Sequence, residues 1–485
     1  MPDIGFVWSE LGGDPALLAR VSTVVRPGAL PARLPVRELA RACVGACALA
    51  AAELGAQRAG RVEVPRVTVD DGAVATAFTG ERHLLVDGRA PQTFAPLSRF
   101  WRTADGWVRT HANYPHHRAR LLHALDVPED PAAVGSALRD RPALEVEEAV
   151  YGAGGLAVAL RTPAEWAAHD QAAALAPRPL VERVRLDTSR ARALPPLDGT
   201  PLLPAAGLRV LDLTRVLAGP VATRTLALLG ADVLRLDAPH LPELPDQHAD
   251  TGFGKRSATL DLAAGRDRFE ELLAAADVVV TGYRPGALDR FGLSPEALAE
   301  RRPGLVVAQV SAWGAYGPWG GRRGFDSLVQ VATGIAAVEG SAERPGALPA
   351  QALDHGTGYL LAAAVLRALT EQAYGDAAGG GRLVRLALAR TAAWLQGGSP
   401  LPEDGAAADG AGADGAAADG AGADGAGADG AEVGTVPYDG PARWLAETDS
   451  PVGRLRYARP AVSFADGPHD WARPPGPWGV DAARW

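Results

Sequence analysis

The sequence has very little of three residue types. Lys255 is the only lysine among 48 basic residues, Met1 is the only methionine, and Cys43 and Cys47 are the only cysteines. Both cysteines lie in an apolar, Ala-rich run, where we expect them to be buried small hydrophobic residues in a reducing compartment. No Cys and His residues have the spacing of metal ligands. The sequence therefore predicts no metal site.

Long apolar runs and a typical leader are also missing. The longest uncharged apolar run, Ala42 to Ala52, has about half of the ~20 residues that a membrane span needs. Met1 to Glu10 lacks the basic and apolar regions of a signal peptide. We therefore expect a cytoplasmic protein that does not bind membranes.

The formal charge of -9 comes mostly from one low-complexity stretch, residues 403–431. Glu403 and six aspartates supply seven negative charges there, and Asp404 to Ala431 repeats a five-residue Ala/Gly/Asp unit. Such a composition cannot bury enough apolar surface to fold, so we expect a disordered linker. The rest of the chain is nearly neutral, which argues against a nucleic-acid partner.

A seven-residue repeat organises the chain. Arg26-Pro-Gly-Ala-Leu-Pro-Ala32 recurs as Arg344-Pro-Gly-Ala-Leu-Pro-Ala350. Each copy leads into an Ala/Leu-rich segment with helical character, Glu38 to Leu54 and Tyr359 to Gln372. A decayed internal duplication explains both observations, since repeats of this kind mark duplicated structural units.

The pattern changes at a Pro-rich linker, Pro195 to Pro204. Before it, Trp101 to Thr110 alternates about Asp105-Gly106 and predicts a hairpin. After it, apolar strands and amphipathic helices alternate, which predicts an α/β fold with an open parallel, Rossmann-like sheet. The expected strands are 208–213, 233–236, 278–281 and 305–310, and the expected helices are 221–229 and 266–275. A smaller α+β domain is expected in the first half.

We therefore divide the chain of 485 residues in two. Residues 1–198, the first half, are predicted to be a degenerate copy that carries a helix and the small domain. Residues 199–400 and 432–485 form the predicted large domain, and 403–431 the linker. The turn after the first strand contains Gly219-Pro220, but Gly-x-Gly-x-x-Gly is absent, so a nicotinamide or flavin site is not supported.

Four motifs carry a resemblance to a known family. They are Leu211-Asp-Leu-Thr with Ala218-Gly-Pro220, Gly254 to Leu262, Tyr283 to Leu293, and Gly324-Phe-Asp326 followed by Leu353-Asp-His-Gly-Thr-Gly358. In order and spacing this region resembles the large domain of the family III CoA-transferases, the CaiB/BaiF type that includes formyl-CoA transferase and α-methylacyl-CoA racemase. Residues 100–122 resemble the family's small domain, and 453–485 its closing segment.

The resemblance implies a CoA transferase that moves CoA from an acyl-CoA to a small carboxylic acid, without a tightly bound cofactor. It implies CoA contacts at Val216, Leu217, Arg235, Leu260, Tyr283, Arg284 and Arg290. Arg215 stands where histidine is frequent, and Ala238 where an arginine can bind phosphate, so Arg235 is the expected substitute. Expected substrate contacts are His111, His116, Tyr316 and Phe325.

Asp354 is the expected nucleophile, and it would form an aspartyl-CoA thioester. An aspartate before Gly-Thr-Gly and a helix is otherwise an ordinary N-cap. Gly356 and Gly358 are expected to present backbone N–H groups to the developing oxyanion. The repeat aligns Val36 with Asp354, so the first copy has no nucleophile. We expect the two halves to build one active site together.

Two alternatives remain. A racemase would need a second base, but Phe325 and Tyr114 hold the places where relatives have a histidine and a glutamate. A non-catalytic CoA-binding protein is the other. The donor and acceptor cannot be inferred from the sequence, and a homodimer, the family's usual state, is expected unless the internal duplication replaces the second subunit.

Overall fold

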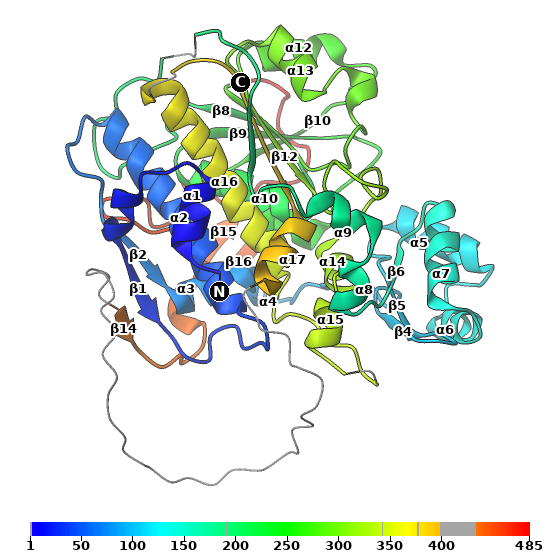
Figure 1. Cartoon of the computed structure of the whole chain (residues 1–485). Helices are drawn as coiled ribbons and strands as arrows, with labels where there is room; N and C mark the ends of the chain where they lie inside the picture. Colours follow the sequence, from blue (N-terminus) through cyan, green and yellow to red (C-terminus); the bar gives the residue numbers. More distant parts are fainter. Residues whose placement is uncertain (1, 191–192, 342, 376–377, 398–432) are drawn as a thin grey trace, which may run out of the picture.

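A computed structural model describes residues 2–190, 193–341, 343–375, 378–397 and 433–485 (Figure 1). The predicted linker, 403–431, lies outside the described residues. The main sheet has seven strands in the order β10-β9-β8-β11-β12-β13-β7, with all neighbours parallel except the antiparallel edge strand β7. In sheet order the strands are β10 (Arg256–Thr259), β9 (Asp232–Asp237), β8 (Arg209–Leu213), β11 (Val278–Thr281), β12 (Val306–Ser311), β13 (Arg382–Ala387) and β7 (Glu182–Arg185).

Helices cover both faces of this sheet, because alternate strand residues point to opposite sides. Val278 and Val280 pack with α10 (Ala218–Leu228) and α16 (Ala352–Tyr374). Val279, between them, packs with α12 (Arg266–Ala274) and α13 (Pro295–Arg301) on the other face. The predicted parallel α/β sheet is confirmed, and the expected strands and helices of the second half agree with the observed ones to within three residues at each end.

A second, shorter sheet contains two strands of the first half and one of the second. Its strands are β14 (Val433–Thr435), β1 (Val21–Val25) and β2 (Val67–Asp70), all parallel. The repeated heptapeptide connects β1 to α2 (Val36–Arg58), which is followed by β2 and α3 (Asp71–Phe78). In the second half, the heptapeptide likewise leads to α16, β13 and α17 (Leu388–Gln396). We call residues 21–78 the N-terminal copy and 306–396 the C-terminal copy.

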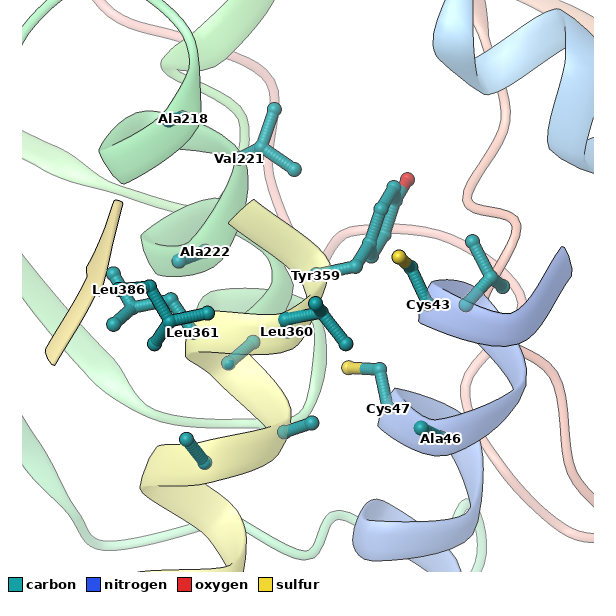
Figure 2. Close-up of a cluster of buried hydrophobic side chains, with 14 of the residues drawn as sticks. Cys43, Ala46, Cys47, Ala218, Val221, Ala222, Tyr359, Leu360, Leu361 and Leu386 are labelled. Carbon is teal, nitrogen blue, oxygen red and sulfur yellow. The ribbon is translucent and has the colours of Figure 1, made fainter. Parts of the chain in front are cut away.

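The two copies pack against each other along their long helices. Figure 2 shows Cys43 and Cys47 of α2 facing Tyr359 and Leu360 of α16. The two helices run in the same direction. Glu53 follows Cys43 and Cys47 on α2, Arg367 follows Tyr359 and Leu360 on α16, and these two charged residues form an ion pair at 2.5 Å. Both cysteine thiols are buried, as predicted, and burial raises the pKa of each thiol. They serve packing rather than nucleophilic chemistry.

Strand pairings also join the two halves of the chain. β7, from the first half, pairs with β13 of the C-terminal copy. Phe464, near the end of the chain, forms an antiparallel bridge with Val67 on β2 of the N-terminal copy. One hydrophobic core contains side chains from α2, α10, α16 and both sheets. The expected boundary at 198/199 therefore does not separate two cores.

The predicted small α+β domain lies apart from these sheets (Figure 1). β4 (Phe100–Arg102) and β5 (Trp107–Thr110) form the expected hairpin, and β6 (Ala157–Ala159) extends it. Its helices are α5 (Pro115–Leu125), α6 (Pro131–Arg139) and α7 (Ala143–Gly152). They bury a separate core that includes Trp101, Val108 and Leu121.

The remaining elements connect these units. β15 (Leu445–Ser450), β16 (Gly453–Ala458) and β3 (Leu85–Val86) form a small antiparallel sheet. The other helices are α1 (Ile4–Glu10), α4 (Gly80–His83), α8 (Pro163–Ala167), α9 (Asp170–Leu175), α11 (Pro245–Thr251), α14 (Asp326–Ala332) and α15 (Ile335–Val338). By length and composition α2 could span a membrane, but nearly all of it is buried inside the protein, as in a core helix.

Candidate active site

Asp354 lies in the first turn of α16 and is almost fully buried. Its backbone N–H donates a hydrogen bond of 2.9 Å to the carboxylate of Asp326, the first residue of α14. Gln330, one turn later in α14, donates to the same carboxylate. Since Gln351 provides no side-chain cap for α16, Asp326 takes that function and fixes the start of the helix.

The site concentrates negative charge. Burial, followed by the charges of Asp326 and Glu81, raises the pKa of Asp354 well above its ordinary value. Burial also raises the pKa of Asp326 to about 6, although its backbone hydrogen bonds work in the opposite direction. Burial opposes ionisation of Glu81 too, but the hydrogen bond with His355, at 3.3 Å, contributes to lowering its pKa. An ionised Asp354 is therefore a poorly solvated carboxylate, the reactive form of this nucleophile.

Asp354 faces a cavity of about 500 Å³ that both halves of the chain build. The first half contributes Glu81, Phe94, His111 and Asn113, while the second half contributes Asp354 itself. Other lining residues are Arg82, Leu84, Pro91, Gln92, Thr93, Ala95, Val216, Leu217, Leu244, Pro245, Asp246, Gln247, Asp250, Phe325, Asp326 and Gln351. We call it the nucleophile cavity.

A second cavity of about 600 Å³ opens at the carboxyl edge of the main sheet. Leu213, Leu236, Gly282 and Ser311, at the ends of β8, β9, β11 and β12, lie in its wall. Ligands of open parallel sheets bind at this edge. The arginines Arg120, Arg215, Arg284, Arg290, Arg322 and Arg323 also line it, so we call it the arginine cavity.

Val216 and Phe325 line both cavities and mark where they meet. Val216 has φ 71, which is unusual for a β-branched residue. Its N–H donates to Glu243 at 3.2 Å and its carbonyl accepts from Gln247 at 2.9 Å, and these contacts hold the strained backbone. Strain of this kind concentrates at functional sites.

Four arginines of the arginine cavity lack acidic partners. Arg120 comes from α5 of the small domain, Arg284 and Arg290 follow β11, and Arg323 precedes α14. Within the described part of the chain none of the four forms an ion pair with a carboxylate. Burial, together with the nearby charges of Arg284 and Arg120, lowers the pKa of the Arg323 guanidinium. Such a concentration of positive charge favours an anionic ligand such as a phosphate.

Most of the expected CoA contacts lie on these cavities. Val216, Leu260, Tyr283, Arg284 and Arg290 line the arginine cavity, and Leu217 lines the nucleophile cavity.

Arg235 differs from the expectation that it contacts CoA phosphate. It is 1% exposed and is held by Asp237 at 2.7 Å and Glu243 at 3.0 Å, away from both cavities. Because its charge is already paired in the core, its contribution is to position Glu243 and, through it, Val216. Lys255 is buried in the same way, 3.0 Å from Asp212 beneath α10.

The expectation for Gly356 and Gly358 is also corrected. Both lie inside α16, where their N–H groups take part in helical hydrogen bonds. A side chain at position 356 would meet Leu39 of α2, and one at position 358 would meet the Ala218 carbonyl of α10. These glycines therefore allow close helix packing instead of forming an oxyanion site.

The expected substrate contacts separate into two groups. His111 and Phe325 line the nucleophile cavity, and their rings stack with centroids 3.6 Å apart. His116 lines the arginine cavity. Tyr316 lines neither cavity. Its hydroxyl donates to Glu182 at 2.8 Å, and its ring packs against Arg178, so its expected role is not supported.

Residues of the first half were missed by the sequence reasoning. Glu81 and Arg120 reach the cavities only through the packing of the two halves. Arg323 directly precedes the Gly324-Phe-Asp326 motif, and this position could have identified it as a site residue from the sequence.

The comparisons with known proteins point to the same family as the sequence motifs. The sequence model of CoA-transferase family III matches residues 205–423. Acetyl-coenzyme A transferase nodX of Hypoxylon pulicicidum is 36% identical over 188 residues, which cover 37% of this chain and 32% of that protein. The probable fatty acyl-CoA transferase Rv3272 of Mycobacterium tuberculosis is 37% identical over 188 residues, covering 35% and 47%. Formyl-CoA:oxalate CoA-transferase of Streptomyces coelicolor is 35% identical over 196 residues, covering 38% and 47%.

Among solved structures, the crystal structure of the Mycobacterium tuberculosis protein Rv3272 is 34% identical, covers 41% of this chain and 57% of that chain, and has a TM-score of 0.38. The chain spans less than half the length of the curated relatives named above. Over residues 205–423 the expected resemblance to CoA-transferase family III is confirmed by the match to the family's sequence model.

Proposed function

We propose that the protein transfers CoA from an acyl-CoA to a carboxylic acid through an aspartyl-CoA thioester on Asp354. The observation that carries the proposal is a buried carboxylate in a cavity that meets an arginine-lined cavity at Val216 and Phe325. The phosphates of CoA would lie at the arginines, and its thioester at Asp354.

The reaction balances without an added proton, electron or metal. A carboxylate oxygen of Asp354 bonds to the acyl carbon of the thioester while the C–S bond breaks, giving a mixed anhydride and CoA thiolate. The thiolate then attacks the Asp354 carbonyl carbon, and the acyl group leaves as a carboxylate. The acceptor carboxylate attacks this aspartyl thioester, and the same two steps follow in reverse. One thioester replaces another, so the exchange is nearly thermoneutral.

Neighbouring groups support each step. Asp326 holds the N-terminal turn that carries Asp354, while burial keeps the ionised carboxylate poorly solvated. Leu217 lines the nucleophile cavity at the N-terminal end of α10. No side chain caps this end of the helix by a hydrogen bond. The partial positive charge of that helix end would stabilise negative charge on the reacting carbonyl oxygen.

The proposal includes the wider expectations for this protein. The CoA thioester is a substrate, no cofactor is tightly bound, and the acceptor is a small carboxylic acid. We propose a cytoplasmic location. Homodimer formation stays a prediction. Within one chain, the pairing of β7 with β13 and of Phe464 with Val67 already joins the two halves.

Isotope exchange tests the proposal. Wild-type protein should exchange a radiolabelled carboxylic acid into the matching acyl-CoA, and Asp354→Asn should lower that rate by about a thousandfold or more. Circular dichroism and a melting curve verify that the isosteric variant folds. Exchange at the wild-type rate in the folded variant would contradict the mechanism.

A racemase acting at the carbon next to the thioester is a second candidate, because Glu81 supplies another carboxylate to the nucleophile cavity. A racemase would incorporate deuterium from D₂O at that carbon, without exchanging labelled acid. Incorporation that requires both Asp354 and Glu81 would favour it. Binding of CoA without either reaction would favour a non-catalytic CoA-binding protein.

A further inference from the structure

His117, on α5 of the small domain, is a buried polar side chain whose hydrogen-bonding groups are unused. It is 4% exposed and lines the arginine cavity, and neither ring nitrogen has a hydrogen-bond partner among the described residues. The centroid of its ring lies 4.1 Å from that of His116 and 5.8 Å from that of Phe325. Most buried polar side chains in proteins are hydrogen-bonded, so this imidazole is suited to a partner from outside the protein.

The surroundings of His117 keep it uncharged. Burial lowers the pKa of its imidazole to about 2, and the groups facing it, His116, His111, Arg323 and Arg120, favour the neutral form as well. A neutral imidazole has one N–H donor and one acceptor nitrogen. Its matching ligand is therefore an uncharged group that contains both an acceptor and a donor.

His117 also lies near the point where the two cavities meet. It lines the arginine cavity, and its ring packs against Phe325, which lines both cavities. Phe325 in turn stacks on His111, which shares the nucleophile cavity with Asp354. The site therefore passes from the arginine cavity, with His117, through Phe325 to the nucleophile cavity.

We propose that His117 binds the pantetheine arm of CoA, donating a hydrogen bond to an amide carbonyl and accepting one from an amide N–H or the hydroxyl. The arm is uncharged, contains two amides and a hydroxyl, and connects the phosphates to the thioester, so its chemistry follows the order of groups in the site. This inference rests on the proposed function and adds the group that positions the thioester at Asp354.

Binding measurements with two ligands test it. Isothermal titration calorimetry compares CoA with adenosine 3′,5′-bisphosphate, which has the 3′-phosphate but no pantetheine arm. His117→Ala should weaken CoA binding roughly five- to twentyfold and leave the bisphosphate unchanged. Arg323→Ala should weaken both ligands. His123→Ala, which removes an exposed histidine of the same helix, should change neither.

Two further measurements keep the result interpretable. His117→Gln retains a donor and an acceptor, so it should recover part of the CoA affinity even where His117→Ala disturbs packing. Because His117 stays neutral, the effect of His117→Ala should be the same at pH 6 and pH 8. Equal weakening of both ligands, or unchanged CoA binding, would overturn the assignment to the pantetheine arm. Failure of the wild-type protein to bind either ligand would instead overturn the proposed function.

Discussion

The N-terminal and C-terminal copies share a framework of two strands and two helices but differ in chemistry. In both, Arg-Pro-Gly-Ala-Leu-Pro-Ala lies between a strand and a long helix, and a parallel strand and a second helix follow; the C-terminal copy has α14 and α15 between its first strand and the heptapeptide. α2 begins with the buried Val36, whereas α16 carries Asp354 in its first turn. The duplicated framework therefore packs in both copies and carries a nucleophile in only one.

The connection before the long helix explains the difference. In the C-terminal copy it contains α14, whose Asp326 caps α16 at Asp354. In the N-terminal copy β1 leads directly into the heptapeptide, and the nearby carboxylates serve structure instead. The Asp71 side chain is fully buried and accepts two hydrogen bonds from the Arg41 guanidinium. Asp70 forms an ion pair with Arg26 at 2.6 Å. The strands and long helices of a copy therefore supply its packing, whereas the connection before the long helix decides whether the copy carries a capped nucleophile.

Separating the halves should have the largest effect on activity. Residues 1–198 and 199–485, expressed alone, should each lack exchange activity, because Glu81, His111 and Asn113 come from one half and Asp354 from the other. Co-expression should restore exchange, since the contacts between the halves are noncovalent. The isotope exchange assay measures all three preparations. A fully active 199–485 fragment would show that the first half is dispensable.

The pH dependence should reveal the acidic surroundings of Asp354. Its raised pKa means that the reactive carboxylate form is lost on acidification at a pH above the ordinary range of aspartate, about 4. With an acceptor acid whose own pKa is lower, kcat/KM should fall as the pH decreases from 8 to 5. Glu81→Gln removes one of the charges that raise this pKa, so the midpoint should move to lower pH. A flat profile would contradict the assigned environment.

The buried carboxylates of the two copies should affect stability in opposite directions. Asp71→Asn breaks an ion pair with Arg41, which is partly exposed, so the free energy of unfolding should fall by about 2 kcal/mol. Asp354→Asn should stabilise the protein instead. A carboxyl group whose pKa is raised on folding contributes stability at low pH that is lost as the pH rises, so this gain should grow from pH 5 to pH 8. Urea titrations at both pH values measure it, and destabilisation by both variants would contradict the comparison.

The sequence predicted the parts of the fold that depend on local pattern. Apolar runs such as Val278–Thr281 read directly as buried strands, and the Asp105-Gly106 turn as a hairpin. The pairing of β7 with β13 and the bridge from Phe464 to Val67 were not predicted, because they join residues far apart in the chain. Asp354, which the motif singled out, lines the nucleophile cavity, whereas Glu81, which lines the same cavity, belongs to no motif.

Gly356, Gly358 and Arg235 show where a local sequence pattern is compatible with two different structural roles. A Gly-Thr-Gly segment is compatible with a backbone that approaches a ligand or with helices in close contact, and only the packing against α2 and α10 distinguishes them. An arginine at the end of a strand is compatible with phosphate binding or with a buried ion pair. For Arg235 the decisive partner is Glu243, which no local pattern connects to it.

Chemical trapping of the intermediate tests the central claim most directly. Wild-type protein incubated with acyl-CoA and then with hydroxylamine should carry a hydroxamate on Asp354, at most one per chain, as identified by mass spectrometry of peptides. Asp354→Asn should give no hydroxamate at this position, and no hydroxamate should form in the N-terminal copy. Exchange activity without any modification of Asp354, or with a hydroxamate on another carboxylate such as Glu81, would contradict the account.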